Sequence, residues 1–211
     1  MAGAKPTVLS HARGSALALA GLAVITARPG HGLIGQLDQA VIGLAEKGRS
    51  PVAVRAARVL SALGEPGFVL FPVAAATAIA VRRAGWRQAC VPGVTVATGA
   101  AVRRVLSWAI ARPRPPDTIW LTEPEGFSMP SKHTSLAVLA AGACANRTAA
   151  GGLGRHGAPL LAAACVGASR VYLGVHWPSD VLAAWLFAEA WLQLAEAVSA
   201  APAAMAKPGR A

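Results

Sequence analysis

The sequence predicts an all-α integral-membrane protein, a bundle of about six membrane-spanning helices with a short amphipathic helical segment after the first span. Two observations predict this class. The 211-residue chain is 55% hydrophobic and only 14% charged, whereas soluble domains carry about 25% charged residues. The apolar residues also gather in separate segments whose lengths approach that of a bilayer-crossing helix. A soluble core of this size would leave much of this apolar surface uncovered, so we expect lipid to cover it.

Six apolar segments account for the expected spans. Several are shorter than the ~20 residues that cross a bilayer, so they need flanking residues or a different tilt. The first is preceded by Lys5 and Arg13, as in a secretory signal peptide. Because further apolar segments follow, we expect an uncleaved first span. The six segments comprise residues 15–27, 67–81, 88–111, 134–145, 158–175 and 181–198.

The stretch between the first two segments differs in composition. Residues 37–63 mix acidic and basic side chains with regularly spaced Val and Leu. This pattern predicts one or two amphipathic helices at the membrane surface, interrupted near residues 48–51 by Gly and Pro. A solvated loop is the alternative interpretation.

Basic residues flank the segments mainly on one side of the predicted bundle. The positive-inside rule makes that side cytoplasmic, in a protein of the cell membrane. We expect residues 13–200 to form one membrane domain, and residues 1–12 and 201–211 to be disordered tails. The flanking basic residues are Lys5, Arg13, Arg82, Arg83, Arg87, Arg147, Arg155, Lys207 and Arg210.

The formal net charge of +11 does not indicate nucleic-acid binding. The basic residues form small groups between apolar segments instead of one basic stripe beside aromatic residues. Such groups suit anionic lipid headgroups. The three cysteines, Cys90, Cys144 and Cys165, each lie within an apolar stretch and form no CxxC pair, so we expect small hydrophobic residues and no disulfide or metal site.

Three polar clusters fall on the opposite side of the predicted bundle, within residues 103–115, 129–134 and 169–180. Ionisable groups at a membrane border are costly and commonly functional. Arginines bind phosphate oxygens, and a neutral imidazole attacks phosphorus. His176 and Asp180 are four residues apart, a spacing that brings them together on a helix face. The clusters therefore predict phosphate-ester hydrolysis through a phosphohistidine.

These clusters resemble the signature of the type 2 phosphatidic acid phosphatase superfamily, which includes bacterial lipid phosphatases, glucose-6-phosphatase and vanadium haloperoxidases. The signature reads Lys-x6-Arg-Pro, Pro-Ser-Gly-His and Ser-Arg-x5-His-x3-Asp. Its third part is the most specific, and it is complete here at Ser169, Arg170, His176 and Asp180.

The other two parts of the signature differ from the family pattern. Residues 130–133 match the second part, with Lys132 in the place of glycine. The first part is incomplete, because Arg114 and Pro115 fit its end but Ser107 stands where the family has lysine.

The resemblance implies a role for each matching residue. His176 is expected to be the nucleophile, Asp180 to orient it, and His133 to protonate the leaving oxygen. The family needs no metal or other cofactor, and we expect none here. The expected phosphate ligands are Arg114, Arg170 and Ser131.

The missing lysine has two possible replacements. Arg103 and Arg104 lie about one helical turn before Ser107, within reach of the same helix face. Lys132 instead brings a cation from the second cluster, and we favour it because it adds a charge where the family has none.

The sequence thus predicts a lipid phosphate phosphatase that acts at the non-cytoplasmic surface. Candidate substrates are phosphatidic acid, phosphatidylglycerol phosphate and polyprenyl phosphates or pyrophosphates. We favour a polyprenyl carrier by analogy with small bacterial enzymes of the family. The alternative is a catalytically weak or inactive relative that binds or moves phospholipid, which Ser107 favours and the intact His133, His176 and Asp180 disfavour. A vanadate-dependent haloperoxidase is disfavoured because those relatives are soluble and this chain is too apolar and too short.

Overall fold

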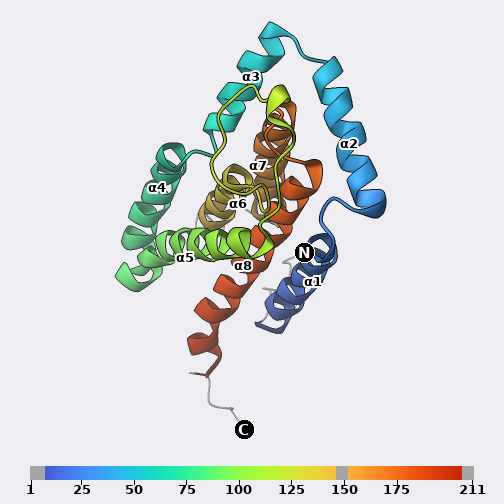
Figure 1. The fold of residues 1–211 in the computed structure, drawn as a ribbon. Coiled ribbons are helices and arrows are strands. Elements are labelled where there is room, and N and C mark those ends of the chain that lie inside the picture. The colour runs from blue at the N-terminus through green and yellow to red at the C-terminus, as the bar shows by residue number, and fades with distance from the viewer. Residues whose placement is uncertain (1–7, 146–151, 206–211) are drawn as a thin grey trace.

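The computed structural model describes residues 8–145 and 152–205, and these residues contain helices and no strand. Each of the six apolar segments forms a helix, so the all-α prediction is confirmed (Figure 1). The six helices are α1 (Val8–Ala27), α4 (Pro66–Ala84), α5 (Trp86–Ile110), α6 (Lys132–Ala145), α7 (Gly152–Tyr172) and α8 (Pro178–Met205).

Four of the described helices, α1, α4, α5 and α8, are long and apolar enough to cross a bilayer on their own. Only 22% to 33% of each apolar window is buried inside the protein, which leaves the rest to face lipid. The 14-residue helix α6 is different, since nearly all of its residues are buried and it packs against α4, α5, α7 and α8. It is therefore apolar on all sides because protein surrounds it.

Small residues bring the long helices into close contact. A Cβ atom on Gly142 of α6 would lie 2.3 Å from Leu192 Cδ1 of α8, and one on Gly167 of α7 would lie 2.2 Å from Val181 Cγ1 of α8. Small residues at such crossings permit the close approach on which helix packing within membranes depends.

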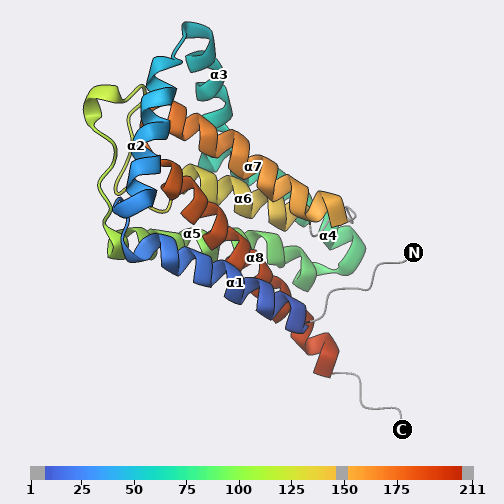
Figure 2. The ribbon, with the colours of Figure 1, turned by 90° about the vertical axis from the view of Figure 1, so that its right-hand side faces the viewer.

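The amphipathic stretch forms two helices, α2 (Gly32–Lys47) and α3 (Pro51–Ala62). The helical prediction is confirmed and the loop alternative is wrong. Ser50 sets the start of α3, because its side chain accepts a hydrogen bond from the Ala53 backbone N–H at 3.2 Å and Pro51 occupies the first turn. Figure 2 shows α2 crossing one end of the bundle, where α3 also lies.

The same end carries a long connection between α5 and α6, which includes the short 3-10 helix η1 (Asp117–Ile119). Two arginines hold this connection, one just before α3 and one within it. Arg49 donates to the Ile119 carbonyl at 2.6 Å, and Arg58 donates to the Leu121 carbonyl at 3.0 Å. The amphipathic helices thereby position the connection, which carries the end of the first polar cluster and the start of the second.

Where the structure describes the two predicted tails, residues 1–12 and 201–211, they are helical. α1 begins at Val8 and α8 ends at Met205, so helix extends into both stretches. Residues 1–7 and 206–211 lie outside the described residues, as does Arg147. Arg82 and Arg83 are exposed at the end of α4 that lies away from α2 and α3 (Figure 2).

Candidate active site

His176 and Asp180 form the centre of the polar end of the bundle. His176 precedes α8 and Asp180 lies in its first turn, so the four-residue spacing brings His176 Nδ1 to 3.5 Å from Asp180 Oδ2. Asp180 Oδ2 also accepts the Trp177 backbone N–H at 2.8 Å and the Ser128 hydroxyl. The carboxylate is thus fixed, and it holds the imidazole with Nδ1 toward Asp180 and Nε2 on the other side of the ring.

His176 is 1% exposed. Burial lowers its pKa from about 6.5 to about 4, and the charges of Arg114 and Arg170 act in the same direction against the opposing effect of Asp180. The imidazole is therefore neutral near pH 7, which is the form that can attack phosphorus.

Arg114 contacts the second ring nitrogen of His176, Nε2. Its Nη1 is 3.1 Å from His176 Nε2 and donates to the Val175 carbonyl at 2.7 Å. Its other nitrogens donate to the carbonyls of Glu125, Gly126 and Phe127 at 2.6, 2.9 and 3.1 Å. Burial lowers the pKa of Arg114 to about 10, so it stays charged near neutral pH. Backbone carbonyls fix its position without neutralising its charge, which suits a phosphate ligand.

Arg170 and Ser131 complete the predicted phosphate ligands. Arg170, near the end of α7, is 4% exposed; its Nη1 donates to Ser61 of α3 at 2.8 Å, and its buried Nε has no hydrogen-bond partner. A buried donor without a partner is unusual, and it fits an anion site. The Ser131 backbone N–H donates to the Asp180 carbonyl at 3.3 Å, and its hydroxyl accepts from Thr134 at 3.1 Å.

His133, at the start of α6, has an acidic partner that the sequence reasoning missed. Its Nε2 is 2.6 Å from Oε1 of Glu65, the residue that precedes α4. Gly64 allows this approach, because a Cβ there would lie 2.7 Å from His133 Cβ. Burial and the charge of Arg170 lower the pKa of His133, and the contact with Glu65 opposes this shift by favouring the protonated imidazole. An isolated acid at the border of an apolar segment was the available signal for Glu65.

A buried network that the sequence reasoning also missed supports Asp180 from behind. Arg112 Nη1 donates to Asp180 Oδ1 at 2.5 Å, and Nη2 donates to Oδ2 of Asp38, on α2, at 2.7 Å. Asp38 also accepts the Ser179 backbone N–H at 2.9 Å. Arg112 lay within the first polar cluster, but nothing in the sequence linked it to an acid of the amphipathic segment.

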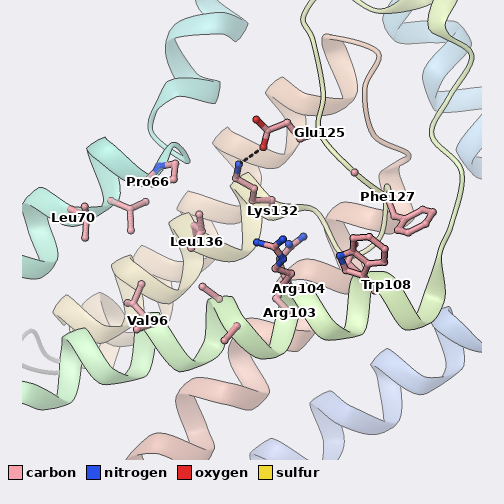
Figure 3. Close-up of a pocket in the computed structure, with 16 residues that line it drawn as sticks. Pro66, Leu70, Val96, Arg103, Arg104, Trp108, Glu125, Phe127, Lys132 and Leu136 are labelled. Atoms are coloured by element: carbon pink, nitrogen blue, oxygen red, sulfur yellow. Dashed lines mark hydrogen bonds and ion pairs between the residues drawn. The ribbon is translucent and has the colours of Figure 1, made fainter.

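The two proposed replacements for the missing lysine lie together in a cavity of about 700 Å³ between α4, α5 and the start of α6 (Figure 3). Arg103, Arg104, Lys132 and Ser107 all line it. Arg103 donates to the Pro130 carbonyl at 3.2 Å, and Lys132 is 3.1 Å from a carboxylate oxygen of Glu125.

Comparison with known proteins identifies the family. A family model for the PAP2 superfamily matches residues 88–201. The chain belongs to the PAP2 superfamily. The resemblance predicted from the three clusters is confirmed, and the chain is an integral-membrane protein of this family.

One relative and one solved structure bear on this PAP2 chain. It is 34% identical over 137 residues to the decaprenylphosphoryl-5-phosphoribose phosphatase of Mycolicibacterium smegmatis, covering 63% of this chain and 71% of that protein. Its fold matches the crystal structure of the first transmembrane PAP2-type phosphatidylglycerolphosphate phosphatase, from Bacillus subtilis, with a TM-score of 0.77 and 23% identity over 93% of this chain and 99% of that one. The structural match supports the fold.

The residues of the PAP2 signature converge at one end of the bundle, although they come from separate segments of the chain. His176 contacts both Asp180 and Arg114, and the Ser131 backbone N–H donates to the carbonyl of Asp180. Among the described residues there is no cluster of three or more His, Cys, Asp or Glu that would hold a metal ion.

Proposed function

We propose that this PAP2 protein hydrolyses a phosphate or pyrophosphate group from a polyprenyl-linked lipid through a phosphohistidine on His176, without a metal ion. The observation that carries the proposal is the orientation of His176. Its Nδ1 faces the Asp180 carboxylate, and its Nε2 faces the Arg114 guanidinium. A neutral, oriented imidazole beside a fixed cation is the arrangement that attack on a phosphate anion requires.

In the first step, His176 Nε2 attacks phosphorus. An N–P bond forms, the P–O bond to the lipid or its headgroup breaks, and His133 gives its proton to the departing oxygen. Asp180 accepts a hydrogen bond from Nδ1–H and stabilises the positive charge that develops on the imidazole.

In the second step, a water molecule attacks the phosphohistidine. His133, now neutral, takes a proton from the water as the new P–O bond forms and the N–P bond breaks. Inorganic phosphate leaves, and both histidines return to their starting states. Glu65, 2.6 Å from His133 Nε2, stabilises the protonated form needed for the next cycle.

Arg114, Arg170 and Ser131 are proposed to bind the transferred phosphate. Arg114 is held by uncharged carbonyls, so its positive charge is available to phosphate oxygens. The Nε of Arg170 lacks a partner, so it can donate a hydrogen bond to them. Phosphoryl transfer depends mainly on such positioning and charge neutralisation.

The substrate class follows from the relative in Mycolicibacterium smegmatis, whose name specifies a decaprenylphosphoryl sugar phosphate. Polyprenyl-linked phosphates are therefore the first substrates to test, with phosphatidic acid and phosphatidylglycerol phosphate as comparisons. The site lies at the end of the bundle that α2 and α3 cross, and the last turn of α4, which carries Arg82 and Arg83, lies away from that end (Figure 2). The positive-inside rule therefore favours action at the non-cytoplasmic face of the cell membrane.

The test is phosphate release from these lipids by detergent-purified protein, with EDTA present. Wild type is compared with His176→Ala and with Arg82→Gln, an exposed control at the far end of α4. We expect wild type and Arg82→Gln to release phosphate at equal rates and His176→Ala to release none. Release that persists in His176→Ala, or that EDTA abolishes, would contradict the mechanism.

A binding-only role is the second candidate, and Ser107 is the observation that favours it. The family lysine is replaced there by a serine that is 4% exposed. If wild type releases no phosphate from any lipid while Ser107→Lys does, the native chain is a binding protein.

A further inference from the structure

The cavity beside the active site carries more positive than negative charge. Among the described residues, three basic side chains line it, from Arg103, Arg104 and Lys132, with a single carboxylate from Glu125. Figure 3 shows the arginines projecting from α5 toward the Lys132–Glu125 pair. Most of the remaining wall is apolar, and α4, α5 and α6 contribute Val69, Leu70, Val96, Ala100 and Leu136 to it. An anionic group attached to a hydrocarbon chain matches both parts of this cavity.

This cavity is separate from the catalytic arginines. Residues 125–127 lie between the two, because their carbonyls bind Arg114 while their side chains or backbone line the cavity. The described lining includes neither His176 nor Arg170. The cavity residues and the catalytic residues are nevertheless close in the sequence, since Lys132 stands between Ser131 and His133. The site therefore offers two neighbouring sets of cations.

We infer that Arg103, Arg104 and Lys132 bind a second phosphate group of the substrate, the one attached to the polyprenyl chain, while the transferred phosphate lies at Arg114 and Arg170. The apolar wall then accommodates the first part of the hydrocarbon chain. This inference rests on the proposed function, whose substrate class it narrows to lipids with two phosphate groups.

The present partner of Lys132 is compatible with such a ligand. The Glu125 side chain is 85% exposed, so its ion pair with Lys132 contributes little. A phosphate that displaces Glu125 meets Lys132 beside two arginines, whose charged hydrogen bonds to phosphate oxygens are strong.

A competing role for these cations is replacement of the missing family lysine at the transferred phosphate. The two roles predict different dependence on the substrate. A replacement cation acts on every substrate equally, because every substrate has a transferred phosphate. A second-phosphate ligand matters only where the second phosphate exists.

Two kinds of lipid supply a second phosphate, a polyprenyl pyrophosphate and a polyprenylphosphoryl sugar phosphate. A polyprenyl monophosphate of the same chain length is the comparison. The spacing of the phosphates differs between the two double-phosphate lipids. The lipid whose hydrolysis depends more on the cavity arginines therefore identifies which of the two supplies the second phosphate.

The experiment measures kcat/KM for these three lipids with wild type, Arg104→Gln and the control Arg82→Gln. Arg104 is exposed on α5, so its substitution leaves the fold in place. We expect the loss in Arg104→Gln to be at least tenfold greater for one double-phosphate lipid than for the monophosphate, with no loss in Arg82→Gln. Equal losses for all three lipids would assign Arg104 to the transferred phosphate, and absence of any loss would also overturn the inference.

Equilibrium binding of the same lipids in a His176→Ala background keeps the inference testable if turnover is absent. Arg104→Gln is expected to weaken binding of the double-phosphate lipid about tenfold more than binding of the monophosphate. Equal binding of both lipids with and without Arg104 would overturn the second-phosphate site, whereas a preserved difference beside absent turnover would overturn only the proposed hydrolysis.

Discussion

Two arginine-containing regions at the same end of the bundle differ in how their charges are satisfied. Around Arg112, each terminal nitrogen bonds to a carboxylate, from Asp180 or Asp38, and the side chains are at most 3% exposed. In the cavity, Arg103 donates to the uncharged Pro130 carbonyl and Arg104 is exposed, while Glu125, the one lining carboxylate among the described residues, bonds to Lys132. A buried charge must be paired by the protein itself, whereas an accessible charge can be paired by a ligand.

The same difference in partners distinguishes two arginines that are close in the sequence, Arg112 and Arg114. Arg112 is committed to carboxylates and orients Asp180, while Arg114 is held by backbone carbonyls beside His176. Residue type alone therefore does not identify a phosphate ligand. The partners of each guanidinium distinguish a positioning residue from a substrate ligand.

The largest expected effect on stability comes from the buried network. Arg112→Ala leaves Asp38 and Asp180 as unpaired buried carboxylates, and breaking a buried pair in this way costs about 3–5 kcal/mol. Thermal unfolding in detergent should show a large fall in Tm relative to wild type and Arg82→Ala. A Tm close to that of wild type would show that the network does not stabilise the fold.

Arg114→Ala should show the opposite behaviour, a large loss of activity with a small change in Tm. Removal of one preorganised donor to a developing charge costs about 10²–10³ in kcat. Measuring kcat and Tm on the same preparation tests both halves of the comparison. If Arg114→Ala lowered Tm as much as Arg112→Ala, the two arginines would not have separate roles.

The protonation of His176 provides a test by pH. Its pKa is lowered to about 4 by burial, so the imidazole should remain neutral at pH 5, where an exposed histidine is largely charged. Because the folded pKa lies below the unfolded value, burying this neutral ring adds stability above about pH 6.5, and that contribution is lost as pH falls through about 4.

The measurement is an NMR titration of ¹⁵N-histidine-labelled protein in detergent, with His176→Ala used to assign the resonance. A His176 resonance that titrates near pH 6.5 would contradict the burial argument.

The smallest expected effect concerns Glu65, the partner of His133. Glu65→Gln keeps a hydrogen-bonding group but removes the charge that favours a protonated His133, and we expect a loss of about tenfold in activity, which is about 1.4 kcal/mol of barrier. We expect kcat to fall by about that factor with Tm unchanged, and Glu46→Gln, an exposed acid on α2, to retain wild-type kcat. Equal kcat in Glu65→Gln and wild type would remove Glu65 from the proton transfer.

Much of the architecture could be predicted from local patterns in the sequence. The apolar segments became helices because each has the composition of a buried or lipid-facing helix over its own length. The pair of His176 and Asp180 was predictable for the same reason, since four residues span one helical turn. The position of α6 was not, because its apolar sequence suits either lipid or a protein interior, and only packing by four neighbouring helices places it at the centre.

By itself, therefore, the sequence determined the helical membrane class, the family motifs and the local pair of His176 with Asp180. Only the tertiary structure decided that Asp38 meets Ser179 and Arg112, and that Arg170 meets Ser61, contacts between residues far apart in the chain. Such contacts have no local periodicity to reveal them. They form because the amphipathic helices fold back over the end of the bundle, where buried charges must find partners.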